Sequence, residues 1–398
     1  MRMKPSLVVV SKGKSPYSTT LTALRSFTLP NLKGKNVLIK PNAARMASPG
    51  DGVTTHPLVV EATIDLLRER GAKEMVIGEG CIFGVDAQAA FEKTGLKGVS
   101  QKKGVKLIDL DQFEPEERII PDGKLLKKIK VSSALNDFDW VISIPVMKTH
   151  MHTRVSLSIK NMKGLLWRRE KAKLHQLRSN QRTDPGYKTL DLAISEMATV
   201  LKPDLAIIDG MVGMEGMGPA YGRSKEMGII IVSDHALSAD AIAARLMGFN
   251  PEIIPHLKLC SERGMGEIQP QKIWIKPKDY LKWETPFEPP PSTLSISYPD
   301  VVLYDEGSCS GCLSTLLVFL QEYHPQLNRY HLEDKNIHIG IGKHLKTCPE
   351  GIILVGNCTA GMKKRGIYVQ GCPPVSSQIM KILSQKKRVL SSNPSWDI

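Results

Sequence analysis

The chain has 398 residues, 41% hydrophobic and 24% charged, which suits two or three folded domains and excludes a protein that is disordered throughout. No apolar run approaches the ~18 residues of a membrane span and no secretory signal is recognisable, so we expect a cytoplasmic protein without a membrane span. The formal net charge is +14, and there are seven cysteines. Most cysteines fall after residue 300, which in a reducing compartment favours metal ligation over disulfides.

The first 250 residues alternate between short apolar runs and helical patterns. The runs predict strands at 7–10, 36–40, 74–78, 105–110, 140–146, 205–208 and 228–233. The helical patterns predict helices at about 56–71, 86–94, 189–201 and 238–247. This alternation predicts an α/β domain with a mainly parallel sheet. In such a sheet the loops after the strands meet at one edge, where ligands bind.

Polar side chains in these loops predict a site for a small anionic ligand. Lys148 and His150 follow the strand at 140–146, and Lys160 and Asn161 come shortly after. Lysines and histidines at this place suit an anion or a carboxylate, because they supply positive charge together with hydrogen-bond donors. The other predicted ligand-binding residues are Lys40, Asn42, Thr55, His56, Glu79, Asp209 and Glu215.

Other functions are open for some of these residues. His150 and His152 could bind a metal, although exposed or hydrogen-bonded histidines are commoner. Several carboxylates could act as general acids or bases, hold a cation, or only cap helices and form ion pairs. These carboxylates are Asp209, Glu215, Asp234 and Asp240. The glycines at 213–218 have the wrong spacing for a dinucleotide fingerprint, so no nicotinamide cofactor is predicted.

The excess positive charge is concentrated between residues 148 and 182, where ten Lys and Arg stand against one acid, Glu170. Such a stretch would attract a small anion, an acidic redox partner or nucleic acid, or it is only a solvated face. Nucleic acid is the least favoured, because Trp167 and Tyr187 are the aromatic residues nearby and no nucleic-acid-binding module is recognisable.

Prolines from residue 277 onward predict a linker at 276–295, between a ligand-binding domain at 1–275 and a second domain at 296–398. In the second domain, apolar runs at 301–304, 352–355 and 366–369 predict buried strands. A cysteine or a cysteine pair follows each run: Cys309 with Cys312, Cys358, and Cys372. Because parallel strands end at the same edge, four thiols can converge on one centre. The leading candidate for that centre is an iron–sulfur cluster.

Zinc is the alternative, since it also binds four cysteines. Zinc ligands usually come as two close pairs, whereas this chain has a single C-x-x-C. A catalytic thiol is less favoured, because no base is evidently paired with one. Cys348, in Thr-Cys-Pro, could replace Cys358 as a ligand.

Residues from about 36 to 265 resemble the family called domain of unknown function 362. Seven ordered motifs carry the resemblance: Lys40-Pro-Asn, Thr54-Thr-His-Pro, Ile77-Gly-Glu-Gly, Pro145-Val-Met-Lys-Thr-His, Ile159-Lys-Asn-Met-Lys-Gly, Ile208-Asp-Gly-Met-Val-Gly-Met-Glu-Gly and Asp240–Phe249. The resemblance implies little about reaction or substrate. Many members carry a ferredoxin-like run of four closely spaced cysteines, which this chain lacks.

Residues of roughly 300–385 are similar to the cluster-binding domain of the small subunit of nickel–iron hydrogenases and of the related subunit of respiratory complex I. This resemblance implies a flavodoxin-like scaffold with one [4Fe–4S] cluster, held by Cys309, Cys312, Cys358 and Cys372. The residues agree with it: Gly311 and Gly371 let the backbone approach a cluster. A helix is predicted at 375–383, with its N-terminus facing the anionic cluster.

Together these features predict an iron–sulfur protein that transfers electrons through one [4Fe–4S] cluster. In its enzymatic form it reduces a small anion bound in the first domain, and an acidic ferredoxin or flavodoxin is the expected redox partner. A redox sensor or an assembly factor is the non-enzymatic alternative. A flavin is compatible with the second domain, but no motif indicates one, and the sequence predicts no oligomeric state.

Overall fold

The structure is a computed structural model that describes residues 6–82, 84–177, 187–290 and 298–390. The chain divides into two compact units, Met1–Pro290 and Pro291–Ile398. Each unit contains a sheet whose strands are largely or entirely parallel and whose connections include helices. The predicted α/β class with a mainly parallel sheet is therefore confirmed.

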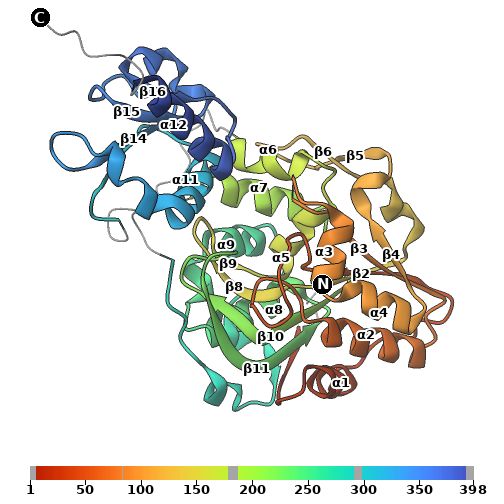
Figure 1. Cartoon of the computed structure of the whole chain (residues 1–398). Helices are drawn as coiled ribbons and strands as arrows, with labels where there is room; N and C mark the ends of the chain where they lie inside the picture. Colours follow the sequence, from red (N-terminus) through yellow and green to blue (C-terminus); the bar gives the residue numbers. More distant parts are fainter. Residues whose placement is uncertain (1–5, 83, 178–186, 291–297, 391–398) are drawn as a thin grey trace, which may run out of the picture. The chain divides into compact units, whose positions relative to one another are not determined.

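The sheet of the first unit has ten strands among the described residues (Figure 1). They are β1 (Leu7–Lys12), β2 (Asn36–Pro41), β3 (Glu74–Glu79), β4 (Lys106–Asp109), β7 (Trp140–Ile144), β8 (Val146–His150), β9 (Arg154–Ser156), β10 (Leu205–Glu215), β11 (Arg223–Ser233) and β12 (Trp274–Lys276). Eight lie in the order β12-β1-β11-β10-β7-β2-β3-β4, while β8 pairs with β10 and β9 with β8. Strand β11 runs antiparallel to both its neighbours, and β9 antiparallel to β8. A separate hairpin is formed by β5 (Pro115–Ile119) and β6 (Lys128–Ser132).

Helices cover both faces of this sheet. They are α1 (Pro16–Ser26), α2 (Pro57–Glu69), α3 (Ala87–Lys93), α4 (Leu96–Lys103), α5 (Ser158–Asn161), α6 (Glu170–Gln176), α7 (Thr189–Ala198), α8 (Ala236–Leu246) and α9 (Pro255–Glu262). Side chains alternate between the faces, so Val9 packs in a core with α1, α2 and α4, which lie together in Figure 1. Val8 and Val10 pack in the opposite core, with α7, α8 and α9. Burial of both faces explains the continuous apolar runs in the sequence.

The predicted ends of two strands, at 140–146 and 205–208, are wrong, and the difference changes where the predicted site residues lie. The strand predicted at 140–146 is interrupted at Pro145, which has no N–H to donate, and the chain continues as β8. The residues predicted as a loop after it, Lys148 to His150, are therefore buried in a strand. Similarly, β10 extends beyond Asp209 to Glu215 and pairs antiparallel with β11.

The predicted linker at 276–295 begins too early. Up to Pro290 this segment belongs to the first unit, where Tyr280 and Phe287 are buried. The backbone N–H of Phe287 donates to the carbonyl oxygen of Met247 at 2.9 Å, which ties the segment to the end of α8. The segment packs on the first unit despite its many prolines, because the two aromatic side chains each bury a large apolar area. Residues 291–295 of the predicted linker lie outside the described residues.

The second unit contains a four-stranded, fully parallel sheet in the order β13-β14-β15-β16. Its strands are β13 (Val301–Asp305), β14 (Ile337–Ile341), β15 (Ile352–Val355) and β16 (Gly366–Val369). Its helices are α11 (Ser310–Tyr323) and α12 (Ser376–Leu390), with a 3-10 helix η9 (Asn357–Arg365) after β15. The helix predicted at 375–383 is α12, which continues further, to Leu390.

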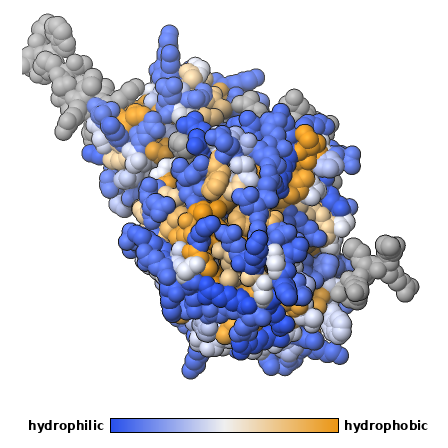
Figure 2. All heavy atoms as spheres, turned by 90° about the vertical axis from the view of Figure 1, so that its right-hand side faces the viewer, coloured by the Kyte–Doolittle hydropathy of each residue, from blue (hydrophilic) through white to orange (hydrophobic). Residues whose placement is uncertain are grey.

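Within the described residues, no helix is both long and apolar enough to cross a membrane. Figure 2 shows one face of the molecule, on which hydrophilic side chains surround smaller groups of apolar ones. Single exposed apolar side chains of this kind are normal on folded proteins.

Candidate functional site

A buried ion pair lies where β2 and β3 end. The side chains of Lys40 and Glu79 are 1% and 0% exposed, and Lys40 Nζ lies 2.7 Å from the Glu79 carboxylate. Lys40 Nζ also donates to the carbonyl oxygen of Pro41 at 2.8 Å and to Asn161 Oδ1 at 3.0 Å. A Cβ added at Gly164 would lie 2.6 Å from Lys40 Nζ, so only glycine fits against the pair. Lys40, Glu79 and Asn161 thus satisfy one another.

Lys148 lies beside this pair, at the centre of a second hydrogen-bond network. Its Nζ donates to Asn42 Oδ1 at 2.6 Å and to the carbonyl oxygen of Val53 at 2.7 Å. Thr55 Oγ1 accepts from the N–H of Asn42 at 2.7 Å and donates to the carbonyl oxygen of Ile144 at 2.6 Å. The network therefore fixes the loop after β2 against the strands β7 and β8.

Further basic side chains gather around Lys148 and form what we call the cationic cluster. Its members are Arg45, Lys148, His150, Lys160, Lys163 and His175. They come from the loop after β2, from β8, from α5, from the 3-10 helix η3 (Met162–Leu165) and from α6. Burial, and then repulsion within the cluster, lowers the pKa of Lys148 and of Lys163 to about 7. The same causes hold the pKa of His150, Lys160 and His175 well below their ordinary values.

Among the described residues, few carboxylates act on the cluster. Asp191 is the carboxylate that acts on Lys160, and burial raises the pKa of Asp191 itself to about 6. Glu79 attracts Lys148 but is already paired with Lys40. These carboxylates offset the charge of the cluster only in part, so its lysines and histidines favour their neutral forms.

Lys163 and His175 form the closest contact in the cluster. Lys163 Nζ lies 2.5 Å from His175 Nε2. A protonated lysine and a protonated imidazole nitrogen would both be donors and would repel each other at this distance. At least one of the two groups is therefore deprotonated, in agreement with their lowered pKa values.

Other predicted site residues hold the backbone. His56 caps α2, and its backbone N–H donates to Asp209 Oδ2 at 2.8 Å. Burial raises the pKa of Asp209 to about 6. Asp240 accepts from the N–H groups of Ser158 and Ile159 at 2.7 and 2.9 Å, which fixes the start of α5. These contacts match the capping alternative for the carboxylates.

Glu215 lies at the far end of the β10–β11 hairpin, where it pairs with Lys225 at 2.9 Å and accepts from the N–H of Glu288 at 3.0 Å. Asp234 is half exposed and lies 3.9 Å from His235 Nε2. Neither carboxylate is among the groups that act on the cluster's lysines.

Sequence reasoning missed four residues near the cluster: Arg45, Lys163, His175 and Asp191. Two had a usable signal, because Arg45 follows the Lys40-Pro-Asn motif and Lys163 lies within the Ile159-Lys-Asn-Met-Lys-Gly motif. His175 and Asp191 lie on α6 and α7, and only the packing of α7 against α5 and of α6 against α7 brings them close.

The basic stretch at 148–182 is divided between the interior and the surface. Lys148, Lys160 and Lys171 are buried, and Lys171 Nζ is paired with Asp111 at 2.7 Å. The exposed members are Arg154, Arg168, Arg169 and Lys173. Arg178 and Arg182 lie outside the described residues. The stretch is therefore a weaker surface for nucleic acid or an acidic protein than its linear charge suggests.

The four predicted cluster ligands lie at the carboxyl edge of the parallel sheet in the second unit. Cys309 caps α11, and Cys312 lies in the first turn of that helix. The Cys309 sulfur accepts hydrogen bonds from the Cys312 thiol and from the N–H groups of Cys312 and Gly311, which hold the pKa of Cys309 below its ordinary value. The pKa of Cys312 is raised, first by this hydrogen bond and then by burial and the nearby charges of Cys309, Cys358 and Cys372.

The backbone comes close to these sulfurs. A Cβ at Gly356 would lie only 3.1 Å from Cys312 Sγ, whereas a Cβ at Gly311 would make an ordinary contact with Cys309 Sγ at 3.5 Å. The loop that carries Cys358 is tied to the loop that carries Cys372, because the N–H of Asn357 donates to the carbonyl oxygen of Gly371 at 2.8 Å. These two loops and the start of α11 form what we call the cradle.

Cys348 occupies a different environment. It packs against Leu345, Ile352 and Leu354, and burial raises its pKa. The largest charges that act on Cys312 are those of Cys309, Cys358 and Cys372, and Cys348 is not among them. We therefore keep Cys358 as the predicted fourth ligand.

No three His, Cys, Asp or Glu side chains of the described residues are arranged to hold a single metal ion. This holds for His150 and His152, where the N–H of His152 donates to His150 Nδ1 at 3.1 Å. It also holds for the four cysteines.

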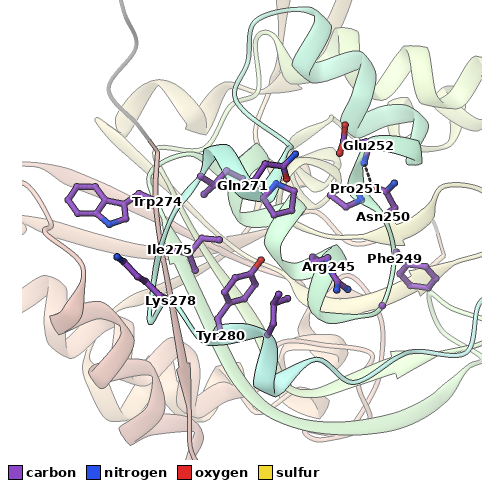
Figure 3. A pocket seen from close by; sticks show the side chains of 14 residues that line it. Arg245, Phe249, Asn250, Pro251, Glu252, Gln271, Trp274, Ile275, Lys278 and Tyr280 are labelled. Carbon is purple, nitrogen blue, oxygen red and sulfur yellow. Dashed lines mark hydrogen bonds between the residues drawn. The ribbon is translucent and has the colours of Figure 1, made fainter.

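A surface cavity of about 690 Å³ lies elsewhere in the first unit (Figure 3). Apolar side chains dominate its lining, among them Phe249, Ile275 and Tyr280. Arg245, at its wall, is paired with Glu284 at 2.5 Å. None of the predicted site residues lines this cavity, and its charged groups are few, so it does not compete with the cationic cluster as a site for an anion.

The family model described as Domain of unknown function (DUF362) matches residues 37–245. The chain belongs to this family. The matched span includes Lys40, Glu79 and every member of the cationic cluster. Thylakoid-associated protein sll1697 of Synechocystis sp. is 27% identical over 233 residues, which are 58% of this chain and 69% of that protein.

Among solved structures, the lactate racemase apoprotein from Thermoanaerobacterium thermosaccharolyticum aligns with a TM-score of 0.40 and 13% identity. The alignment covers 64% of this chain and 56% of that protein, so this DUF362 chain matches little more than half of its length.

Lys148 should make the stability of the DUF362 unit rise with pH above neutrality. Burial lowers its pKa in the folded protein to about 7, from an ordinary value of 10.5. Between these values the unfolded chain binds the extra proton, so the free energy of unfolding should increase by up to ~1.4 kcal/mol per pH unit. Urea unfolding between pH ~7 and ~9 measures this slope.

The control compares two variants. Lys148→Met should lose this share of the slope, whereas Lys202→Met, at an exposed position, should keep it. If the free energy of unfolding rose equally with pH in the wild type and in Lys148→Met, the lowered pKa of Lys148 would not be its cause.

Proposed function

We propose that the protein is an iron–sulfur redox protein whose first unit binds a small anionic substrate. The observation that carries the anion site is the cationic cluster, whose basic groups act on one another, while Asp191 opposes the charge of Lys160 and Glu79 that of Lys148. A bound carboxylate or phosphate would supply the missing negative charge. The site lies beyond the carboxyl ends of β2, β3 and β7, where parallel sheets bind ligands.

The donors suit a small anion better than a polymer. Arg45 offers a planar fork of N–H groups, Lys148 offers an ammonium group from β8, and Lys160 offers an amine from α5. Both lysines are more than nine-tenths buried. An extended chain of nucleic acid could not reach their amino groups. Binding an anion favours the protonated lysines, so affinity should fall as the pH rises through about 7.

The second part of the proposal places one [4Fe–4S] cluster on Cys309, Cys312, Cys358 and Cys372. The glycine-lined cradle and the backbone N–H groups at the start of α11 support it, because they favour thiolate over thiol. The motifs of residues 300–385 that resemble the cluster domain of hydrogenase small subunits and of the complex I subunit are a further reason for the proposal. When bound, the cluster would supply one-electron transfer. A ferredoxin or flavodoxin is the proposed partner, and no flavin is part of the proposal.

Anaerobic purification followed by iron, acid-labile sulfide and zinc analysis tests the cofactor. We expect about four irons and four sulfides per chain, and a paramagnetic signal after reduction with dithionite. Stoichiometric zinc without sulfide would contradict the cluster.

Small anions added one at a time to the reduced protein test the function. Reoxidation of the cluster by one anion, with that anion chemically reduced, is the expected result. A cluster that no anion reoxidises would contradict substrate reduction and favour a redox sensor instead.

A further inference from the structure

The lysines around the cationic cluster differ in their partners. Four of them contact an acceptor or an ion-pair partner: Lys40 with Glu79, Lys148 with Asn42, Lys163 with His175 and Lys171 with Asp111. Lys160 is 8% exposed, yet among the described residues its ammonium has neither a hydrogen bond nor a carboxylate within ion-pair distance. A buried amine without a partner is costly, which marks Lys160 as a functional group.

The backbone that carries Lys160 is held firmly. Asp240 accepts from the N–H groups of the two preceding residues, Ser158 and Ile159. The following residue, Asn161, donates to the carbonyl oxygen of Lys40 at 3.1 Å. The amine is therefore presented by a rigid segment, as a reacting group requires.

Other polar atoms near Lys160 are also orphaned. Asp191 Oδ1 and both ring nitrogens of His256 are buried without a hydrogen-bond partner among the described residues. Asp191 and His256 each interact electrostatically with Lys160. Buried polar atoms of this kind are normally satisfied by ordered water or by a ligand.

The charges around Lys160 favour a neutral amine. Burial comes first, followed by the positive charges of Lys163, Lys148 and Arg45, and together they hold the pKa of Lys160 well below its ordinary value. A lysine that is desolvated and lies next to other cations is the kind that forms Schiff bases with carbonyl compounds. The same cations attract the anionic group of a substrate.

We propose that Lys160 forms an imine with the carbonyl carbon of a 2-oxo acid whose carboxylate is bound by the cationic cluster. This inference rests on the proposed anion site and adds the class of substrate. Imine formation is not a redox step, so this reaction needs no electron from a cluster in the second unit.

The step balances with the groups at hand. The lone pair of Lys160 Nζ forms a bond to the carbonyl carbon, and the π electron pair of the carbonyl moves to its oxygen. That oxygen takes up the two hydrogens that the nitrogen loses and leaves as water, so that a C=N bond replaces the C=O bond. His150 and His175, both within electrostatic range of Lys160, carry the protons in their neutral forms. Asp191 opposes the positive charge of the protonated imine.

Reductive trapping tests the inference on the intact, anaerobically purified protein. Glyoxylate and cyanoborohydride are added near pH 7, and peptide mass mapping locates the secondary amine that results. We expect at least roughly tenfold more adduct on Lys160 than on the exposed Lys202, because each unit by which a pKa is lowered gives about ten times more neutral amine. Lys160→Met should lose this adduct, whereas Lys173→Met should keep it. Adducts on surface lysines alone, with Lys160 unmodified, would overturn the inference.

Calorimetric titration with glycolate separates this inference from the function on which it rests. Glycolate has the carboxylate of glyoxylate but no carbonyl. If glycolate binds and glyoxylate leaves Lys160 unmodified, the imine is wrong and the anion site stands. If neither compound binds, the anion site itself fails. Should Lys160→Met not fold, mapping on the wild-type protein decides on its own.

Discussion

Glu79→Gln should destabilise the first unit by about 3–5 kcal/mol, because it leaves the Lys40 ammonium buried without an opposite charge. Both side chains are at most 1% exposed, and Lys40 Nζ lies 2.7 Å from the carboxylate. The remaining acceptors of Lys40, the carbonyl oxygen of Pro41 and Asn161 Oδ1, are neutral. Urea unfolding of the wild type and the variant measures the difference.

Two further variants make this result specific. Lys40→Met combined with Glu79→Gln removes both charges and should recover much of the loss, since burying a charge alone costs more than burying neither. Lys106→Met breaks the exposed pair with Glu74 and should cost less than ~1 kcal/mol. If Glu79→Gln lowered the free energy of unfolding by less than ~1 kcal/mol, the prediction that Glu79 neutralises a buried Lys40 ammonium would be wrong.

Cys312→Ala should remove most of the iron from the anaerobically purified protein. Cys312 is 5% exposed, contacts Cys309, and is affected by the charges of Cys358 and Cys372. Losing this thiolate deletes one of four ligands at the most enclosed position of the cradle, and the iron content should fall from about four per chain to below about one.

The chain offers matched controls for this variant. Cys260→Ala, at a buried thiol of the first unit, should keep the iron. Cys348→Ala should also keep it, because Cys348 packs among apolar side chains. Iron lost from Cys348→Ala but kept in Cys358→Ala would reverse the assignment of the fourth ligand.

Much of the architecture could be predicted because buried parallel strands have a distinctive sequence. Runs such as 36–40 and 352–355 are apolar throughout, since both faces of the sheet are covered. Polar residues directly after these runs had to lie at the carboxyl edge, and the structure places Lys40, Glu79 and Cys358 there.

The position of the charges could not be predicted from composition. Lysines are usually exposed, so ten Lys and Arg in one stretch suggest a surface. The structure instead buries Lys148 in β8 and Lys160 in α5, because Pro145 starts a new strand and Asp240 draws α5 into the core. Contacts between residues this far apart along the chain leave no local pattern.

Glu215 shows the opposite error. It stands in the motif that begins at Ile208, and Asp209, also in that motif, does lie near His56 at the edge of the sheet. The strand β10 is longer than its apolar core, however, and carries Glu215 to the far end of a hairpin, where Lys225 pairs with it. Met214 is paired with Lys148 of β8, and successive side chains of a strand point to opposite faces, so Glu215 faces away from Lys148.

Anomalous diffraction from crystals soaked in selenate tests the central claim, that the first unit holds a small anion among buried cations. The account predicts a selenium peak bounded by Arg45, Lys148 and Lys160, and its loss in Lys160→Met crystals. Selenium found only beside exposed basic residues such as Arg154 and Arg168, with none in the cationic cluster, would contradict it.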